Sequence, residues 1–265
     1  MSVGSRVRAL GPRTRGPVVA AGNGLVPERW RPAANDIARR LTAWPPVGLV
    51  RFGNLGRVSP IAPMSPPRYG RAIDRWYIDG FLEAESSWIR GDVLEVGDLG
   101  YTERFGGPDL ASRSILQSPV GAGPDADYVA DLADAPELPD QRFDCVVLPQ
   151  TLLFIYDVGA AVATLRRILR PGGVALVTVP GISQSVPGDK EQWGQYWSFT
   201  DDSLSRLFGD EFGPEEVEIT SRGNVLTAAS FLYGLVVDDL RPHHFEVDDP
   251  AYPLILTVRA RRSMH

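Results

Sequence analysis

Residues 93–107, VLEVGDLGYTERFGG, combine an apolar run with a glycine turn that could hold a ligand. Three apolar residues surround Glu95, and Gly97 ends the run. A glycine at such a turn lets the backbone approach a bound molecule closely, because no side chain stands in the way. The stretch therefore predicts a strand that leads into a binding turn.

The single cysteine limits which covalent links and metal sites the chain can form. Cys145 excludes an internal disulfide and a cysteine-based zinc site, and no metal site is expected. Because it lies in the apolar run RFDCVVL, it is expected to pack in the core rather than to react. A single free thiol fits a reducing, cytoplasmic location.

Helical and strand-like patterns alternate from residue 71 onward. Within residues 71–89, apolar residues recur at spacings of three and four, which indicates an amphipathic helix that Gly91 closes. Seven short runs predict strands: residues 92–97, 112–118, 126–132, 142–148, 174–180, 215–220 and 253–260. Helices are expected over residues 157–169, after Thr200 and after Asn224, with a stop signal in RPGG at 170–173.

This alternation is typical of one fold class. We expect an α/β, doubly wound, mostly parallel seven-stranded sheet that carries helices on both faces. In such sheets a ligand binds beyond the carboxyl ends of the strands, where the strand order reverses. The turn at Gly97 would lie at that edge.

The amino-terminal part differs in composition from the rest. Residues 1–65 are rich in arginine and proline and are interpreted as a partly ordered extension with one helix at 33–44, and residues 66–265 as the folded domain. Of the net charge of −6, residues 1–57 contribute +8 and the remainder −14. A nucleic-acid partner is not expected, since such proteins show a basic face on the folded domain. The apolar runs are too short to cross a membrane, and no oligomeric state is assigned.

The order of several motifs resembles one enzyme family. Glu95-Val96-Gly97, Asp131-Leu132, FDCVVLPQTLLFIYDV from residue 143 and LRPGGVALVTVPG from residue 169 are similar to the class I S-adenosylmethionine-dependent methyltransferases. The chain looks most like the small-molecule branch related to the ubiquinone and sterol methylating enzymes. The resemblance covers about residues 66–259, and it implies a Rossmann-like methyltransferase fold with S-adenosyl-L-methionine as cofactor.

The resemblance also implies roles for residues of the binding turn. Gly97 would approach the methionine part of the cofactor, with Glu95 supporting the turn and Asp98 and Gly100 nearby. In the helix before the first strand, Asp74 would take the amino group and Arg75 the carboxylate, with Tyr77 beside them.

Further roles follow at the next strand ends. Asp131 and Leu132 match the segment that meets the adenine. Gln150 and Thr151 match the floor of the methyl-transfer site.

The turn and the second strand depart from the family pattern. The family's E-x-G-x-G-x-G would place glycines where Leu99 and Tyr101 stand, and Gly100 is out of phase. No acidic residue follows the second strand, so Gln117 or Ser118 would have to bind the ribose. A neutral partner contributes less than a carboxylate, which could weaken binding roughly tenfold.

No catalytic residue is assigned from the sequence. Related sequences often carry a histidine, a suitable base, where this chain has Leu153, and His243 and His244 fall in a polar loop where a solvated pair is the simpler interpretation. The transfer itself depends chiefly on alignment and exclusion of water.

Aromatic residues follow the fifth strand and suggest an acceptor site. Trp193, Tyr196 and Trp197 could stack on a sugar or a planar acceptor, and an alternative is a hydrophobic cluster beneath a long loop. The leading hypothesis is therefore methyl transfer to a small molecule, such as a hydroxyl of a sugar or a secondary metabolite. The alternative is a methyltransferase-like protein that has lost methyl transfer and serves as a binding partner or runs other chemistry in the same pocket.

Overall fold

A computed structural model describes residues 32, 45, 49–62 and 70–264. The chain divides into two units, Met1–Arg57 and Val58–His265. In the first unit the described part holds a 3-10 turn at Gly53–Leu55. The expected helix at 33–44 and the expected boundary at 65/66 lie outside the described residues.

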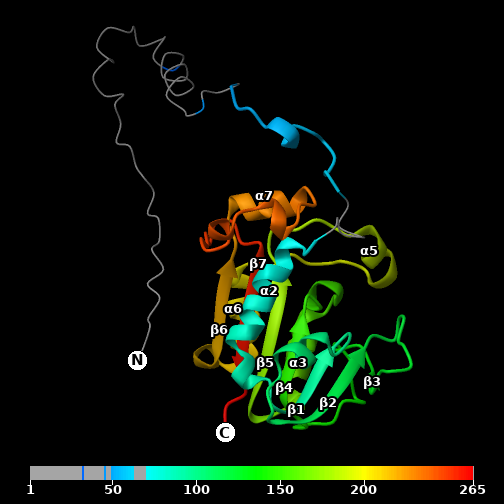
Figure 1. Cartoon of the computed structure of the whole chain (residues 1–265). Helices are drawn as coiled ribbons and strands as arrows, with labels where there is room; N and C mark the ends of the chain where they lie inside the picture. The colour runs from blue at the N-terminus through cyan, green and yellow to red at the C-terminus, as the bar shows by residue number, and fades with distance from the viewer. Residues whose placement is uncertain (1–31, 33–44, 46–48, 63–69, 265) are drawn as a thin grey trace. The chain divides into compact units, whose positions relative to one another are not determined.

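The second unit is built on a seven-stranded sheet (Figure 1). The strands are β1 (Gly91–Val96), β2 (Leu110–Gln117), β3 (Tyr128–Val129), β4 (Phe143–Pro149), β5 (Leu169–Pro180), β6 (Val217–Arg222) and β7 (Ile255–Arg261). Their order is β3-β2-β1-β4-β5-β7-β6, and β7 runs antiparallel to both of its neighbours while the other pairs are parallel. The predicted fold class, a doubly wound and mostly parallel sheet, is confirmed.

Helices connect the strands and cover both faces of the sheet. They are α2 (Ile73–Ala84), α3 (Gly100–Phe105), α4 (Val158–Ile168), α5 (Pro187–Trp193), α6 (Asp201–Phe212) and α7 (Val225–Leu232). Short 3-10 turns are η4 (Ser86–Trp88), η5 (Leu152–Phe154), η6 (Pro214–Glu216), η7 (Val237–Asp239) and η8 (Pro242–His244). Among the described residues, no helix combines the length and apolarity that a membrane span requires.

Strand β4 shows why both faces need cover. Val146 and Leu148 face one hydrophobic cluster with residues of α4 and α6, whereas Cys145 and Val147 face another with residues of α2 and α7. All four side chains are fully buried, as the continuous apolar run predicts for a central parallel strand. Cys145 is thus a core residue, and burial raises the pKa of its thiol well above the ordinary range.

Local capping signals place three helices as the sequence predicts. Asp157 accepts a hydrogen bond from the amide of Ala160 at the start of α4. Thr200 and Asn224 cap α6 and α7 with their side-chain oxygens. Each cap satisfies a backbone donor that has no partner inside the helix.

Three expected boundaries differ from the structure by three residues or more. The helix expected to run to Gly91 ends at Ala84, and η4 follows it. The third strand shrinks from residues 126–132 to Tyr128–Val129, because an antiparallel bridge between Asp131 and Asp134 turns the chain away from the sheet edge.

The third error concerns the start of β5. The helix does stop before Pro171, but the strand already begins at Leu169, which pairs with Phe143 before the register slips to Cys145 and Val174. RPGG therefore forms an irregularity inside the strand, where Gly172 has φ +81°.

Candidate functional site

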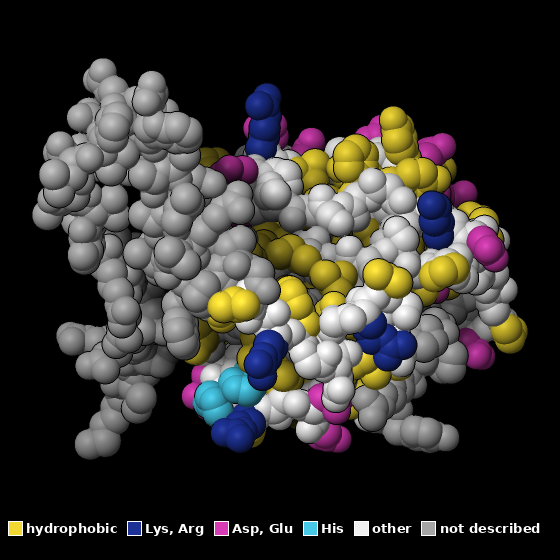
Figure 2. Space-filling model, turned by 90° about the horizontal axis from the view of Figure 1, so that it is seen from above, with side chains coloured by type: hydrophobic (Ala, Val, Ile, Leu, Met, Phe, Trp, Pro, Cys, Tyr) yellow, Lys and Arg dark blue, Asp and Glu magenta, His cyan; other side chains and the backbone are white. Residues whose placement is uncertain are grey.

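A cavity of about 550 Å³ opens at the carboxyl ends of β1, β2 and β4. Strands β1 and β4 are neighbours, while β2 and β3 extend to one side and β5 to the other, so the cavity lies where the strand order reverses. Its lining is Val96, Gly97, Leu116, Gln117, Ser118, Val120, Gly121, Ala130, Asp131, Leu132, Pro149, Gln150, Thr151, Phe154, Ile155, Tyr156, Gln192, Trp193 and Tyr196. Figure 2 looks onto this edge of the sheet, where hydrophobic side chains reach the surface in the middle of the face.

Gly97 gives the cavity an open stretch of backbone. Its φ of +104° lies in the left-handed region, and a Cβ placed on it would meet no atom within 4 Å. Its amide is held by the carbonyl of Leu116 over 2.9 Å. The turn is thus fixed in a conformation that favours glycine, and its open side leaves room for a ligand to touch the backbone.

Glu95 supports this turn from beneath. Its side chain is buried and accepts hydrogen bonds from the amides of Tyr101 at 3.1 Å and Thr102 at 2.7 Å. Burial raises the pKa of Glu95, and the hydrogen bonds from α3 oppose that rise. Glu95 therefore anchors the first turn of α3 rather than lining the cavity.

The altered glycine pattern is accommodated by a short helix. Leu99 occupies the position before α3, and Asp98 accepts a hydrogen bond from the amide of Gly100 over 2.7 Å. Tyr101 lies inside the helix and points its hydroxyl at Arg75, whose Nη1 is 2.7 Å away. Asp98 and Gly100 lie beside the turn but not among the cavity-lining residues.

Gln117 and Ser118 end β2 and line the cavity. The Gln117 side chain donates from Nε2 to the Gly97 carbonyl over 2.8 Å and accepts at Oε1 from the Gly123 amide over 2.6 Å. Ser118 Oγ accepts from the Val120 amide at 3.3 Å. Both side chains therefore hold loops together at the place where the sequence predicts contact with a ribose.

Asp131 and Leu132 form the wall next to β3. Leu132 is 3% exposed, whereas Asp131 is exposed and accepts a hydrogen bond from the amide of Ala133 over 2.9 Å. Asp131 is the one charged side chain among the described residues that line the cavity. An apolar wall beside a carboxylate is the pairing predicted for an adenine and its exocyclic amine.

Gln150 and Thr151 form the floor beyond β4 and line the cavity. Gln150 has φ +48°, a value that residues other than glycine rarely adopt, and its amide donates to the Thr178 carbonyl over 2.8 Å. The Thr151 hydroxyl donates to the Pro149 carbonyl at 3.0 Å. Backbone strain of this kind is found mainly at functional sites, and it persists only where the surrounding structure holds the residue in place.

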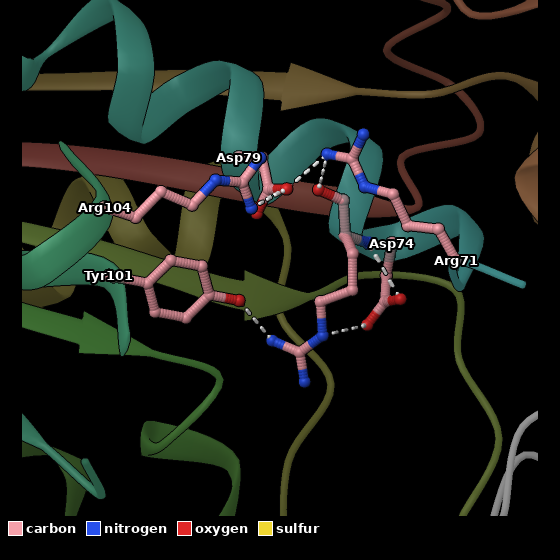
Figure 3. A network of polar contacts seen from close by, with 6 residues as sticks. Arg71, Asp74, Asp79, Tyr101 and Arg104 are labelled. Atoms are coloured by element: carbon pink, nitrogen blue, oxygen red, sulfur yellow. Dashed lines mark hydrogen bonds and ion pairs between the residues drawn. The ribbon is translucent and has the colours of Figure 1, made fainter. Parts of the chain in front are cut away.

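Asp74 and Arg75 belong to a polar network between α2 and α3 (Figure 3). Arg75 Nε lies 3.8 Å from Asp74 Oδ2, and Asp74 is buried. Burial raises the pKa of Asp74, and the positive charge of Arg75 opposes the rise. Nearby, the buried Asp79 is paired with Arg71 and with Arg104, the latter over 2.6 Å.

Asp74, Arg75 and Tyr77 are all absent from the residues that line the cavity. The Tyr77 ring packs in the core 6.0 Å from the ring of Phe245, and burial raises the pKa of its hydroxyl to about 12. The structure thus brings Asp74 and Arg75 to the Tyr101 side of the turn and places Tyr77 apart from both.

The aromatic residues after β5 form one wall of the cavity. Trp193, which ends α5 rather than lying in a loop, donates from Nε1 to the Val120 carbonyl over 3.2 Å, and Tyr196 also lines the cavity. Trp197 lies outside the lining and donates to the Ile155 carbonyl over 3.0 Å.

Sequence reasoning missed Phe154 and Tyr156, which complete this wall. Two aromatic residues directly after the fourth strand, in LLFIYDV, were the available signal. The ring centroids of Phe154 and Trp193 lie 5.6 Å apart, and those of Tyr156 and Tyr196 lie 5.4 Å apart.

Neither described histidine reaches the cavity. His243 and His244 lie in η8 with their ring centroids 4.3 Å apart, and His244 Nδ1 accepts from the Arg241 amide. Leu153 is buried in the core cluster. The lining contains no histidine, lysine, cysteine or glutamate, and no group of three metal-ligating side chains occurs among the described residues.

Comparison with known families agrees with this geometry. Residues 107–177 match the family described as "Methyltransferase domain". The matched segment contains β2, β3 and β4, which carry one side of the cavity. The predicted enzyme class, an S-adenosylmethionine-dependent methyltransferase, is supported by this match. No curated protein sequence matches the chain significantly.

Several solved structures are similar to the chain at low identity. The YcgJ protein of Bacillus subtilis is 11% identical, with a TM-score of 0.42 over 71% of this chain and 99% of that one. An S-adenosylmethionine dependent methyltransferase from Mesorhizobium loti is 14% identical, with a TM-score of 0.42 over 72% and 98%. A SAM dependent methyltransferase from Archaeoglobus fulgidus is 11% identical, with a TM-score of 0.44 over 71% and 94%.

Proposed function

We propose that this chain, whose residues 107–177 match a methyltransferase domain, moves a methyl group from S-adenosylmethionine to a small-molecule acceptor. The observation that carries the proposal is the cavity at the reversal of strand order, with the open backbone of Gly97 at its edge. A cytoplasmic biosynthetic role and a place in the ubiquinone and sterol branch belong to the same proposal.

The residues present fit the cofactor. A cofactor of this class needs room beside a glycine turn, an apolar wall for a planar base and a polar partner for the amine of that base. Gly97 supplies the first, Leu132 the second and Asp131 the third. Gln117 and Ser118 would face the sugar, and Arg75 with Asp74 would face the amino-acid end.

The chain's own residues would act by binding and orientation. The cofactor supplies an electrophilic methyl group. Gln150 and Thr151 would hold the floor beneath the reacting atoms, because both are tied to the sheet by hydrogen bonds. The aromatic wall would exclude water from the acceptor side, and alignment of this kind accounts for most of the acceleration expected in such a transfer.

Titration of the full chain with S-adenosylhomocysteine tests the proposal by calorimetry. We expect micromolar binding in the wild type and a loss of at least about tenfold in Gly97→Val, whose side chain would enter the open space beside the turn. The matched control is Gly213→Val at the end of α6, where φ is +90° and a Cβ would likewise meet nothing within 4 Å. Both variants carry similar backbone strain, but only the first touches the cavity.

The two results separate the candidate functions. Millimolar or undetectable binding by the wild type would overturn methyl transfer and favour the alternative, a methyltransferase-like protein that no longer uses this cofactor. Equal losses in Gly97→Val and Gly213→Val would show that the turn acts on stability alone.

A further inference from the structure

Four aromatic rings form a corner on the acceptor side of the cavity. We call Phe154, Tyr156, Trp193 and Tyr196 the aromatic corner. The planes of Phe154 and Trp193 are inclined by 54°, and those of Tyr156 and Tyr196 by 76°, so the ring faces turn in different directions. Tyr156 is 71% exposed and Tyr196 51% exposed, which leaves both rings accessible from the mouth.

The chemistry of the aromatic corner favours a cation. The faces of aromatic rings carry the negative part of a quadrupole and attract a cation within about 6 Å of the ring centre. The described lining residues include no lysine or arginine that would repel a cation, and the charged residue among them, Asp131, is a carboxylate on the adenine wall. The chain from residue 58 onward carries a net charge of −14, which adds a long-range attraction for cations.

The described lining residues lack the side chains that most often remove a proton from an alcohol. Histidine, lysine, cysteine and glutamate are absent from among them, and Asp131 lies on the wall assigned to the adenine. An aliphatic alcohol keeps its proton at neutral pH, so a hydroxyl acceptor would need such a base. A weakly basic amine, such as an aromatic ring nitrogen, is largely unprotonated at neutral pH and needs none, because its lone pair is already available.

We infer that the acceptor, on the proposed methyl-transfer function, is a weakly basic amine whose methylated, positively charged product is held by the aromatic corner. The acceptor nitrogen attacks the methyl carbon with its lone pair, the new carbon–nitrogen bond forms, and the electrons of the carbon–sulfur bond stay on sulfur. The positive charge passes from sulfur to nitrogen. No proton has to leave during the step, so no base is required.

The competing acceptor classes fit less well. A thiolate or a carboxylate would bring a negative charge against the negative faces of the aromatic rings. A hydroxyl, expected from the sequence, would form a neutral product that gains nothing from the cation site and would leave its proton without an acceptor.

Choline and its neutral isostere 3,3-dimethylbutan-1-ol test the inference directly, since they differ by one nitrogen in place of one carbon. Calorimetric titrations of the full chain saturated with S-adenosylhomocysteine, at matched chloride concentration, should show choline binding at least about fivefold more tightly. Tyr156→Leu and Tyr196→Leu should each reduce that preference. Tyr252→Leu, a control at a tyrosine that is 43% exposed and outside the cavity, should leave it unchanged.

Equal binding of choline and the alcohol would overturn the inference, and so would a preference that survives in both corner variants. The titration with S-adenosylhomocysteine distinguishes failure of this inference from failure of the proposed function. If S-adenosylhomocysteine binds but choline is not preferred over the alcohol, the proposed methyl transfer is retained and the amine acceptor is rejected. If S-adenosylhomocysteine does not bind, the proposed function falls and the amine acceptor that rests on it falls too.

Discussion

The side-chain amide of Gln117 donates a hydrogen bond from Nε2 to the carbonyl oxygen of Gly97 over 2.8 Å. Its Oε1 also accepts from the Gly123 amide, so one side chain ties the end of β2 to the Gly97 turn after β1 and to the following loop. Gln117 thus has a structural role at the end of β2. A carboxylate could not donate to Gly97.

Gln117→Leu should therefore affect both stability and binding. Loss of two hydrogen bonds leaves the Gly97 carbonyl and the Gly123 amide without this partner, and we expect the free energy of unfolding to fall by about 1–2 kcal/mol. The affinity for S-adenosylhomocysteine should fall about tenfold, because the turn loosens. Chemical denaturation and calorimetry measure the two effects. Ser118→Ala removes the 3.3 Å hydrogen bond from the Val120 amide. It should change the free energy of unfolding by less than about 0.5 kcal/mol.

Arg75 provides a test of the predicted contact with the cofactor carboxylate. Arg75→Gln should weaken S-adenosylhomocysteine about tenfold, since a charge-assisted hydrogen bond is lost. Binding of 5′-methylthioadenosine, which lacks the amino-acid end, should be unchanged. Arg104→Gln is the matched control, because Arg104 belongs to the same network but pairs with Asp79 (Figure 3). Equal weakening of both ligands by Arg75→Gln would contradict the assignment.

Gln184 carries a buried amide that has no hydrogen-bond partner for either atom within the described part of the chain. An unsatisfied buried amide is costly, so Gln184→Leu should raise the free energy of unfolding by about 1 kcal/mol. Gln195→Leu should lower it by a similar amount, since Gln195 accepts from the Val186 amide at 3.1 Å and donates to the Gln184 carbonyl at 3.3 Å. Urea denaturation at neutral pH compares them, and destabilisation by Gln184→Leu would refute the expectation.

Asp92 should make stability depend on pH in the acid range. A hydrogen bond from Ser112, together with Arg142 and Arg170, lowers the pKa of Asp92 to about 2 in the folded state. Because the folded pKa lies below the unfolded value of about 4, this stabilisation is present above pH 4 and is lost as the pH falls toward 2. Asp92→Asn should cost about 1–2 kcal/mol at pH 7 and much less near pH 2.

The control for Asp92 is another carboxylate in an ion pair. Asp140 lies 2.6 Å from Arg167 but its side chain is 68% exposed. Solvent screens such a pair, so Asp140→Asn should cost less than about 0.5 kcal/mol at either pH. A pH-independent effect of Asp92→Asn in guanidinium titrations would show that Asp92 acts through packing alone.

Much of the fold could be predicted from the sequence because its signals are local. The buried run around Cys145, the caps at Asp157, Thr200 and Asn224, and the stop before Pro171 each depend on neighbouring residues. Edges were harder to predict. The third strand is shorter than expected because the bridge between Asp131 and Asp134 competes with pairing in the sheet. No local sequence pattern indicates that competition.

The sequence by itself determined the strand and helix patterns, the caps and the position of the glycine turn after the first strand, since each depends on residues close along the chain. The tertiary structure decided which side chains meet. Gln117 of β2 reaches Gly97 after β1, Arg75 of α2 reaches Tyr101 of α3, and Tyr156 meets Tyr196 within the aromatic wall of the cavity. These contacts depend on how distant segments pack, which periodicity does not encode, and that packing made an aromatic corner of two separate segments.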